Sequence, residues 1–263
     1  MDFRLTKKYA LVYRGGMTVI LVIVLKLIAH QMGWEVLSLS PLFSGIVAAN
    51  VFLLGFLLSG VISDYKESEK LPGELSAILS TFADEAATVH LRSGDKIAQE
   101  LSAFVRELAG SIHAWFYRKE RTGNLMNKIS ELNRFFLAFE PLMQANYIVR
   151  MKQQQDALRR IIIRIHTIRE TSFISSGYLI AEVTSILLAL GLVMAKIDPF
   201  YESLFVVGVI VFLLSFLILL IRDLDNPFGY YENGSTEDVS LKPLEDFISG
   251  TSIGSESRTG AAN

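Results

Sequence analysis

Residues 37–63 read LSLSPLFSGIVAANVFLLGFLLSGVIS, and residues 64–70 continue as DYKESEK. The first segment exceeds the roughly 20 apolar residues that cross about 30 Å of hydrocarbon. No turn signal separates it from the charged segment that follows. The sequence therefore predicts a helix that begins in lipid and continues into water.

Three further segments have the composition of membrane spans, and they cover residues 15–31, 174–195 and 203–221. Lys26 and His30 interrupt the first of them, but no small-residue cleavage site follows its apolar core, so we interpret it as a retained span and not as a signal peptide. The whole chain is 51% hydrophobic, which is high for a soluble domain of 263 residues. We predict an all-α integral membrane protein with four transmembrane helices in two pairs and an intervening cytosolic helical domain.

The distribution of charge predicts the orientation. Arg4, Lys7, Lys8 and Arg14 precede the first span, whereas the loop after it contains Glu35 and no lysine or arginine. Because positively charged flanks stay on the cytoplasmic side, the amino terminus is expected there. Four spans then return the carboxyl terminus to the same side. The plasma membrane, or the inner membrane of the cell, is the expected location.

These features divide the chain into five expected parts. They are an N-terminal cytoplasmic segment with the first two spans (1–63), a cytosolic helical domain (64–173), the third and fourth spans (174–222), a post-membrane anchoring segment (223–247) and a disordered tail (248–263).

The domain between the span pairs has the composition of an amphipathic helical bundle. Apolar residues recur there at spacings of three and four, as at Leu101, Phe104, Val105 and Leu108. Helix breaks are expected near residues 93–95, near residues 122–124 and at Pro141. The last helix, about 142–172, contains many arginines. We interpret it as a packed helix with solvated or paired charges, and the alternative is a basic lining for anions or a lipid-facing collar.

Several classes of chemistry find no support in the residues. The chain has no cysteine and four scattered histidines, so neither disulfides nor a metal site is predicted. It contains no nucleophile elbow, phosphate-binding glycine loop or His-Glu-x-x-His helix. We therefore predict no enzyme activity, no cofactor and no nucleic-acid partner.

Two motifs resemble those of one membrane protein family. Residues 53–56 read LLGF and are followed by DYKESEKLPGEL at 64–75, while residues 225–229 read DNPFG. The first motif resembles the second helix of the bestrophins, and the second is similar to the Asn-Pro-Phe-Gly element after their last span. Both lie at the expected places along the chain.

The chain also departs from the family pattern. Asp64-Tyr65-Lys66 replaces an Arg-Trp-Trp motif, and Pro72 replaces a tryptophan of bacterial members. The run of acids that clasps calcium in animal members is replaced by YYENG at residues 230–234. The residues that clasp calcium in animal members therefore have no counterpart at this position, and calcium dependence stays open.

The resemblance implies passive ion conduction, with anions such as chloride as the usual cargo, through a homo-oligomer that is most often a pentamer. Ala48, Phe52 and Phe56 lie four residues apart and so share one face of the second span. Bestrophins have three apolar residues at this spacing in a narrow pore neck, and we predict the same role here. The alternative is that these aromatics face lipid or the core of the same subunit.

Three polar residues within the spans need partners, because isolated polar groups are costly in hydrocarbon. For Asn50 we expect an interhelical hydrogen bond, and the alternative is a permeation site. Lys26 reaches the headgroups if it lies near the outer end of its span, or it pairs with Glu182 in the third span. Glu182 alternatively lies near the headgroups. The alternative functional interpretation of Lys26 and Glu182 is a relay for protons or ions.

The motif after the fourth span has the chemistry of a helix stop and a tight turn. We expect Asp225, Asn226, Pro227, Phe228 and Gly229 to anchor the tail against the cytosolic domain or a neighbouring subunit. Asp223 and Asp225 are candidates for helping to bind a cation.

The rival to conduction is a membrane adaptor or signalling protein that does not conduct and whose cytosolic helices bind a partner. A transporter is a weaker third reading, since no inverted half-repeat is visible.

Overall fold

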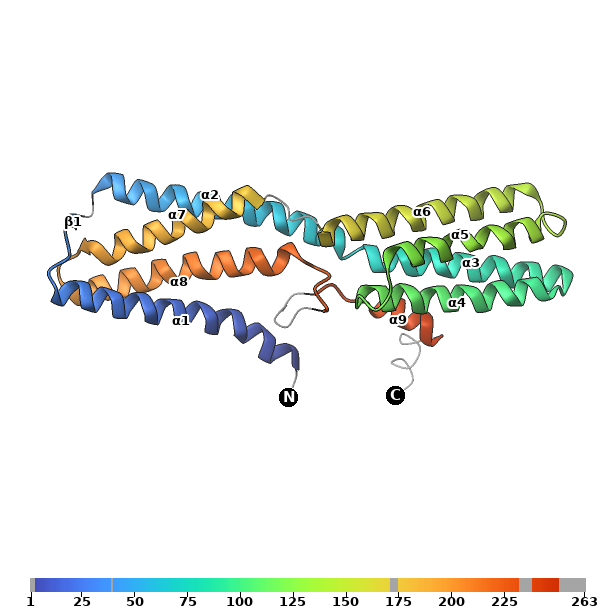
Figure 1. Ribbon diagram of the computed structural model, residues 1–263, viewed down its shortest axis with the longest axis horizontal. Helices are drawn as coiled ribbons and strands as arrows, with labels where there is room; N and C mark the ends of the chain where they lie inside the picture. Colours follow the sequence, from blue (N-terminus) through green and yellow to red (C-terminus); the bar gives the residue numbers. More distant parts are fainter. Residues whose placement is uncertain (1–2, 39, 171–174, 232–237, 251–263) are drawn as a thin grey trace, which may run out of the picture. The chain divides into compact units, whose positions relative to one another are not determined.

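The apolar segments of the sequence form long helices in the computed structural model, which describes residues 3–38, 40–170, 175–231 and 238–250 (Figure 1). Four helices of the described part are long and apolar enough to cross a membrane: α1 (Phe3–Gln31), α2 (Pro41–Ser68), α7 (Ser175–Met194) and α8 (Phe200–Asp225). The predicted all-α integral membrane fold with four spans is confirmed.

The described chain forms two compact units. The membrane unit contains residues 3–65 and 175–227 together with Asp238, and the bundle unit contains residues 66–170, 228–231 and 239–250. Residues 228–231 and 239–247 of the expected post-membrane segment thus belong to the bundle unit.

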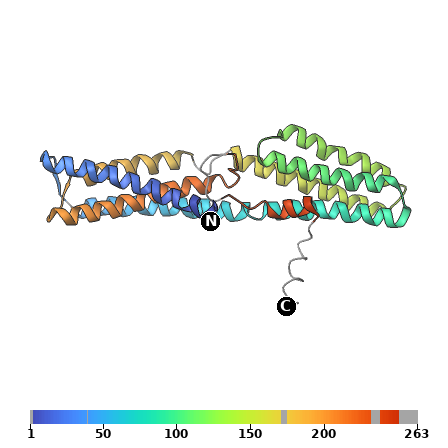
Figure 2. The same ribbon diagram turned by 90° about the horizontal axis from the view of Figure 1, so that it is seen from below.

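In the membrane unit, α1 lies along α8 (Figures 1 and 2). Val22 and Ala29 of α1 pack with Val207 and Val211 of α8 in one apolar cluster. Gly208 of α8 faces α1, because a Cβ there would lie 3.7 Å from the Val19 side chain, an ordinary contact distance. Two short strands, β1 (Leu37–Ser38) and β2 (Ala195–Lys196), pair in parallel outside the helices.

In the bundle unit, four helices surround an aromatic core: α3 (Leu71–Ser93), α4 (Lys96–Phe116), α5 (Thr122–Phe139) and α6 (Ala145–Glu170). Phe82 of α3 stacks with Phe136 of α5 at 6.2 Å between ring centroids, and Phe104 of α4 lies 5.2 Å from Phe135. The short helix α9 (Lys242–Ser249) packs on α3 and α4 (Figures 1 and 2). Helix α9 was not predicted from the sequence.

The predicted breaks in the bundle are close to the observed ones. Gly94 follows α3 with φ +66°, a left-handed conformation that glycine favours, and Asp95 caps α4 by accepting from Ile97 N at 3.0 Å. The turn before α5 occupies residues 117–121, just ahead of the expected 122–124, and Arg118 takes a left-handed conformation there. Residues 251–263 of the expected disordered tail lie outside the described part.

Candidate functional site

Helix α2 buries one face within the membrane unit. Leu54, Leu57 and Val61 are at most 2% exposed and pack with Ala181 and other residues of α7 and α8. These positions recur at three and four residues, which is the period of one helix face. The packing therefore fixes the rotation of α2 about its own axis.

The predicted neck residues lie on the opposite face of α2. Phe52 is 77% exposed, Phe56 is 61% exposed, and Ala48 is also exposed. Two residues along a helix correspond to a rotation of about 200°, so Phe52 points away from buried Leu54. The alternative in which Phe52 and Phe56 belong to the core of the same subunit is therefore wrong. Lipid and a neighbouring subunit remain as the surroundings of this face.

The same outward face carries small residues. Gly45 and Gly55 have no atom within 4 Å of the position that a Cβ would take, so the protomer itself does not need glycine there. Ala49 and Ser59 are exposed beside them. Small residues on a membrane helix allow a second helix to come close. The outward face of α2 is thus shaped for helix contact.

Asn50 makes the interhelical bonds that we expected. Its side chain is 5% exposed, donates from Nδ2 to Ser185 Oγ at 2.9 Å, and accepts at Oδ1 from Thr184 Oγ1 at 2.7 Å. Both partners belong to α7. These bonds set the register of α2 against α7, and with it the height of Phe52 and Phe56 along the span.

Lys26 is fully buried, and its partner is not Glu182. Its Nζ lies 2.7 Å from Glu35 Oε1 and donates to the carbonyl oxygens of Val193, at 3.2 Å, and Ala195. The pairing with Glu182 that we considered is therefore wrong, because the ion-pair partner of Lys26 is Glu35, in the loop after α1. Glu35 is the only acidic residue in the sequence of that loop, and this fact could have identified it as the partner of Lys26.

Glu35 also contacts His30. His30 Nδ1 lies 2.8 Å from Glu35 Oε2, and the imidazole ring stacks on Phe200 at 3.8 Å. Burial raises the pKa of Glu35, but hydrogen bonds and charges from Lys26 and His30 lower it by more. The net result is a pKa below the usual range of a glutamate, so the carboxylate is ionised at neutral pH. The cluster joins α1, its following loop and the end of α7.

Glu182 pairs with Arg222 of α8, in an ion pair between Glu182 Oε1 and both Arg222 Nε, at 2.8 Å, and Nη2. One turn further along, Tyr178 donates to Asp225 Oδ1 at 2.6 Å. These two contacts join α7 to α8 at the end where α8 stops. Described residues that could together hold a metal ion are not found at this end or elsewhere in the described part.

The motif at residues 225–229 ends α8, as its proline and glycine predict. Asp225 is the last residue of the helix, and Asn226 has φ −118° and ψ 78°, outside the helical region. Within the bundle unit, Phe228 is fully buried, and its ring centroid lies 5.6 Å from that of Phe116. Phe228 thus fixes the chain after α8 to the aromatic core of the bundle.

At the charged end of α2, Glu67 is compensated. Arg164 of α6 donates from Nε and Nη2 to the two carboxylate oxygens of Glu67, both at 3.1 Å. This two-fold geometry suits a guanidinium and a carboxylate. This acid, which follows the apolar part of α2, is therefore paired with a base.

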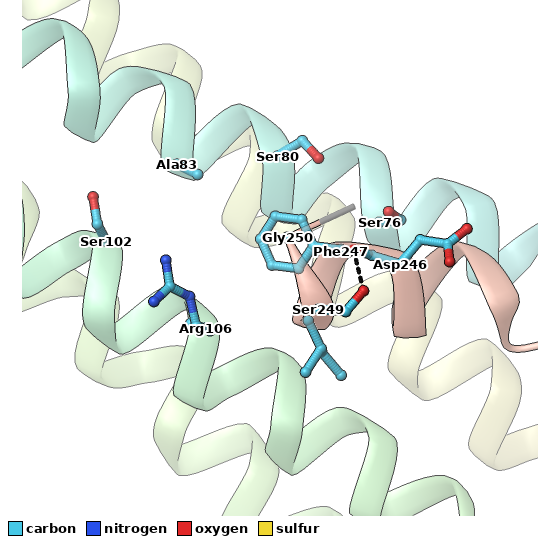
Figure 3. A pocket seen from close by; sticks show the side chains of 10 residues that line it. Ser76, Ser80, Ala83, Ser102, Arg106, Asp246, Phe247, Ser249 and Gly250 are labelled. Atoms are coloured by element: carbon cyan, nitrogen blue, oxygen red, sulfur yellow. Dashed lines mark hydrogen bonds between the residues drawn. The ribbon is translucent and has the colours of Figure 1, made fainter. Parts of the chain in front are cut away.

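The bundle unit also contains a pocket that the sequence did not predict. It has a volume of about 730 Å³ and lies between α3, α4 and α9, with Ser80, Arg106, Asp246 and Phe247 among its lining residues (Figure 3). Arg106 comes from α4 and Asp246 from α9, so the pocket offers one charge of each sign. No motif in the sequence identifies it, because α9 is far from α3 and α4 along the chain.

Comparison with known proteins supports the fold. No protein-family model matches the sequence, and no curated protein does so either. A crystal structure of a membrane protein superimposes with a TM-score of 0.75 at 17% identity, covering 89% of this chain and 97% of that one. A crystal structure of a bacterial bestrophin homologue from Klebsiella pneumoniae gives 0.69 at 19% identity, covering 92% and 97%. The expected bestrophin-like fold is confirmed.

Proposed function

We propose that this chain, which has the fold of the Klebsiella pneumoniae bestrophin homologue, is a divergent bestrophin-like channel that conducts ions passively through a homo-oligomeric pore lined by α2. The observation that carries the proposal is the outward exposure of Phe52 and Phe56, at 77% and 61%, on a helix whose other face is buried. Two aromatic side chains in line with Ala48 form an apolar stripe that nothing in the protomer covers within the described residues.

The composition of this face favours a neighbouring subunit over lipid. Contact with lipid chains does not require small side chains, whereas close packing against another helix does. Gly45, Ala49, Gly55 and Ser59 lie on the same exposed side as the aromatics. We infer that copies of α2 surround a common axis, with five copies as the resemblance implies.

In such a ring, Ala48, Phe52 and Phe56 repeat around the axis and form an apolar constriction. A narrow apolar constriction empties of water and so resists ion passage until it widens. Helix α2 has 28 residues, or about 42 Å at 1.5 Å per residue, which is enough to cross the hydrocarbon and continue beyond it.

We propose anions, chloride among them, as the permeant ions. The pairing of Glu67 with Arg164 removes one negative charge from the charged end of α2 and leaves a lower barrier to anion entry. The proposed channel has its amino and carboxyl termini in the cytoplasm, because basic residues precede the first span. The plasma membrane is its proposed location. The proposed activity requires neither catalysis nor a cofactor.

The test is electrical recording from purified protein in planar bilayers, comparing wild type with a variant that combines Phe52→Ala and Phe56→Ala. Removing both rings widens the constriction and makes it easier to wet, so conductance or open probability is expected to rise. The matched control is Phe205→Ala, which removes an aromatic side chain that is 73% exposed on α8. The control should conduct as wild type does.

The outcomes separate the parts of the proposal. Silence of both wild type and the double variant at high incorporation contradicts conduction and favours an adaptor that binds a partner through its helical bundle. An equal effect of Phe205→Ala removes the special role of Phe52 and Phe56. Reversal potentials in a potassium chloride gradient that follow potassium contradict the anion assignment alone.

A further inference from the structure

The turn between α4 and α5 combines aromatic and basic residues. Residues 115–121 read WFYRKER, with Trp115 and Phe116 buried and Arg118, Lys119 and Arg121 exposed. This motif plays no part in the proposed pore. Its basic side chains are exposed, whereas its aromatic residues Trp115 and Phe116 are buried in the bundle.

The turn is held in one conformation. Arg118 has φ +56°, a left-handed conformation that costs a residue with a Cβ about 1 kcal/mol or more and persists only where the surroundings enforce it. Its guanidinium lies 4.0 Å from the centre of the Tyr231 ring and 3.4 Å from the Glu170 carboxylate. Arg169 adds a hydrogen bond to Trp115 O at 3.2 Å. These contacts therefore hold the backbone that carries the exposed cations in a defined conformation.

Two contacts of the turn are close along the chain to membrane spans. Glu170 is five residues before Ser175, where α7 begins, and Tyr231 is six residues after Asp225, where α8 ends. Arg118 contacts both Glu170 and Tyr231. The turn therefore packs against residues that are joined by short stretches of chain to two membrane spans.

Two cations of the turn are available to a ligand. Lys119 and Arg121 are exposed and have no acidic partner among the described residues. The acid between them, Glu120, is engaged: hydrogen bonds from the Asn124 side chain and from Arg121 N lower its pKa. Arg118 keeps Glu170 beside it. With Arg118 beside Glu170, the turn keeps a net positive charge, because Lys119 and Arg121 together outweigh the single negative charge of Glu120.

We propose that the α4–α5 turn binds the anionic headgroups of bilayer lipids through Lys119 and Arg121. Exposed lysine and arginine near a membrane attract anionic lipid. Tyrosine is a common residue at the headgroup level of membrane proteins, and this turn contains or contacts two tyrosines, Tyr117 and Tyr231. The binding does not depend on whether the protein conducts. It would fix the bundle unit to the inner leaflet at a second place besides the chain connections.

The test is a titration of the full-length, detergent-solubilised protein with phosphatidylglycerol, read by native mass spectrometry, with phosphatidylcholine as the uncharged reference. Wild type is expected to retain phosphatidylglycerol preferentially. Lys119→Gln combined with Arg121→Gln should weaken its apparent affinity roughly tenfold. The exchange Lys119→Arg with Arg121→Lys keeps both charges and should restore wild-type binding.

The chain offers a matched control in the turn between α3 and α4. Arg92 and Lys96 are exposed there, and α4 separates this turn from the other by 21 residues, or about 30 Å. Arg92→Gln with Lys96→Gln should leave lipid binding unchanged. Equal losses in both double variants, or no loss in the first, overturn the proposal. Displacement of the lipid by an equal concentration of inorganic phosphate also overturns it, since the ligand is then a soluble anion.

Discussion

At the scale of single residues, the buried lysine of the first span is the feature that departs most from an ordinary membrane helix. Lys26 is fully buried, yet its ammonium group has an ion pair with Glu35 and donates to two backbone carbonyls at the end of α7. An uncompensated charge in this position would be strongly destabilising. The cluster therefore stabilises the junction of α1, its loop and α7, and a relay is not needed to explain Lys26.

We predict that Glu35→Gln lowers the thermal unfolding midpoint at neutral pH, because it leaves the buried Lys26 without a counter-charge. The pKa of Glu35 is lowered in the folded protein, so its contribution is present above the pKa of the unfolded chain and is lost as pH falls through the folded value. The difference between wild type and variant should therefore be largest near pH 7 and disappear in acid. Unfolding midpoints between pH 3 and pH 8 measure this.

Glu202→Gln is the control for that experiment, because Glu202 is exposed in the first turn of α8. It should change the midpoint only slightly at any pH. A gap between wild type and Glu35→Gln that persists unchanged at pH 3 would contradict the role assigned to the Glu35 charge.

At the scale of elements, α2 is a helix with two different faces. Asn50 and Leu54 hold it to α7 and α8, and Phe52 and Phe56 point outward. The hydrogen bonds of Asn50 to Thr184 and Ser185 set the register between α2 and α7. The position of the proposed constriction along the span thus depends on a polar contact behind it.

We predict that Asn50→Leu destabilises the protein by about 1 kcal/mol, the usual size of an interhelical hydrogen bond in a membrane. Ser185→Ala should produce part of the same loss, and the double variant should lose less than the sum, because the two side chains share one bond. Thermal unfolding of the four proteins gives this coupling. Strict additivity would show that the bond does not stabilise the fold, and a changed reversal potential in Asn50→Leu would favour a permeation site.

At the scale of the whole molecule, the proposed function depends on assembly. The outward face of α2 has room at Gly45 and Gly55 that the protomer does not use. Gly191 of α7 is different, because a Cβ there would lie 3.1 Å from the Phe43 ring. The two kinds of glycine separate assembly from folding.

We predict that Gly55→Leu leaves the protomer folded but reduces the size or stability of the oligomer, since a side chain then occupies the space of the neighbouring helix. Gly191→Leu should instead lower the free energy of unfolding by about 1–3 kcal/mol through crowding against Phe43. Native mass spectrometry gives the oligomer mass and thermal unfolding the stability. An unchanged oligomer in Gly55→Leu would mean that this face does not meet another subunit.

The sequence by itself determined the four spans, the helical character of the bundle and the end of α8 at the motif of residues 225–229. These features follow from local physics: the length of apolar runs, the period of amphipathic faces, and the backbone limits of proline and glycine. The helix stop at residues 225–229 and the break after Ser93 are of this kind.

Only the tertiary structure decided which polar groups meet and which face of α2 is outward. Lys26 pairs with Glu35 and not with Glu182, and α9 packs on α3 and α4 far from it in sequence. The left-handed Arg118 likewise depends on Glu170 and Tyr231, which no local pattern brings to it. Long-range pairing and the rotation of a helix about its axis result from the packing of several elements at once, and a single segment of sequence does not contain that information.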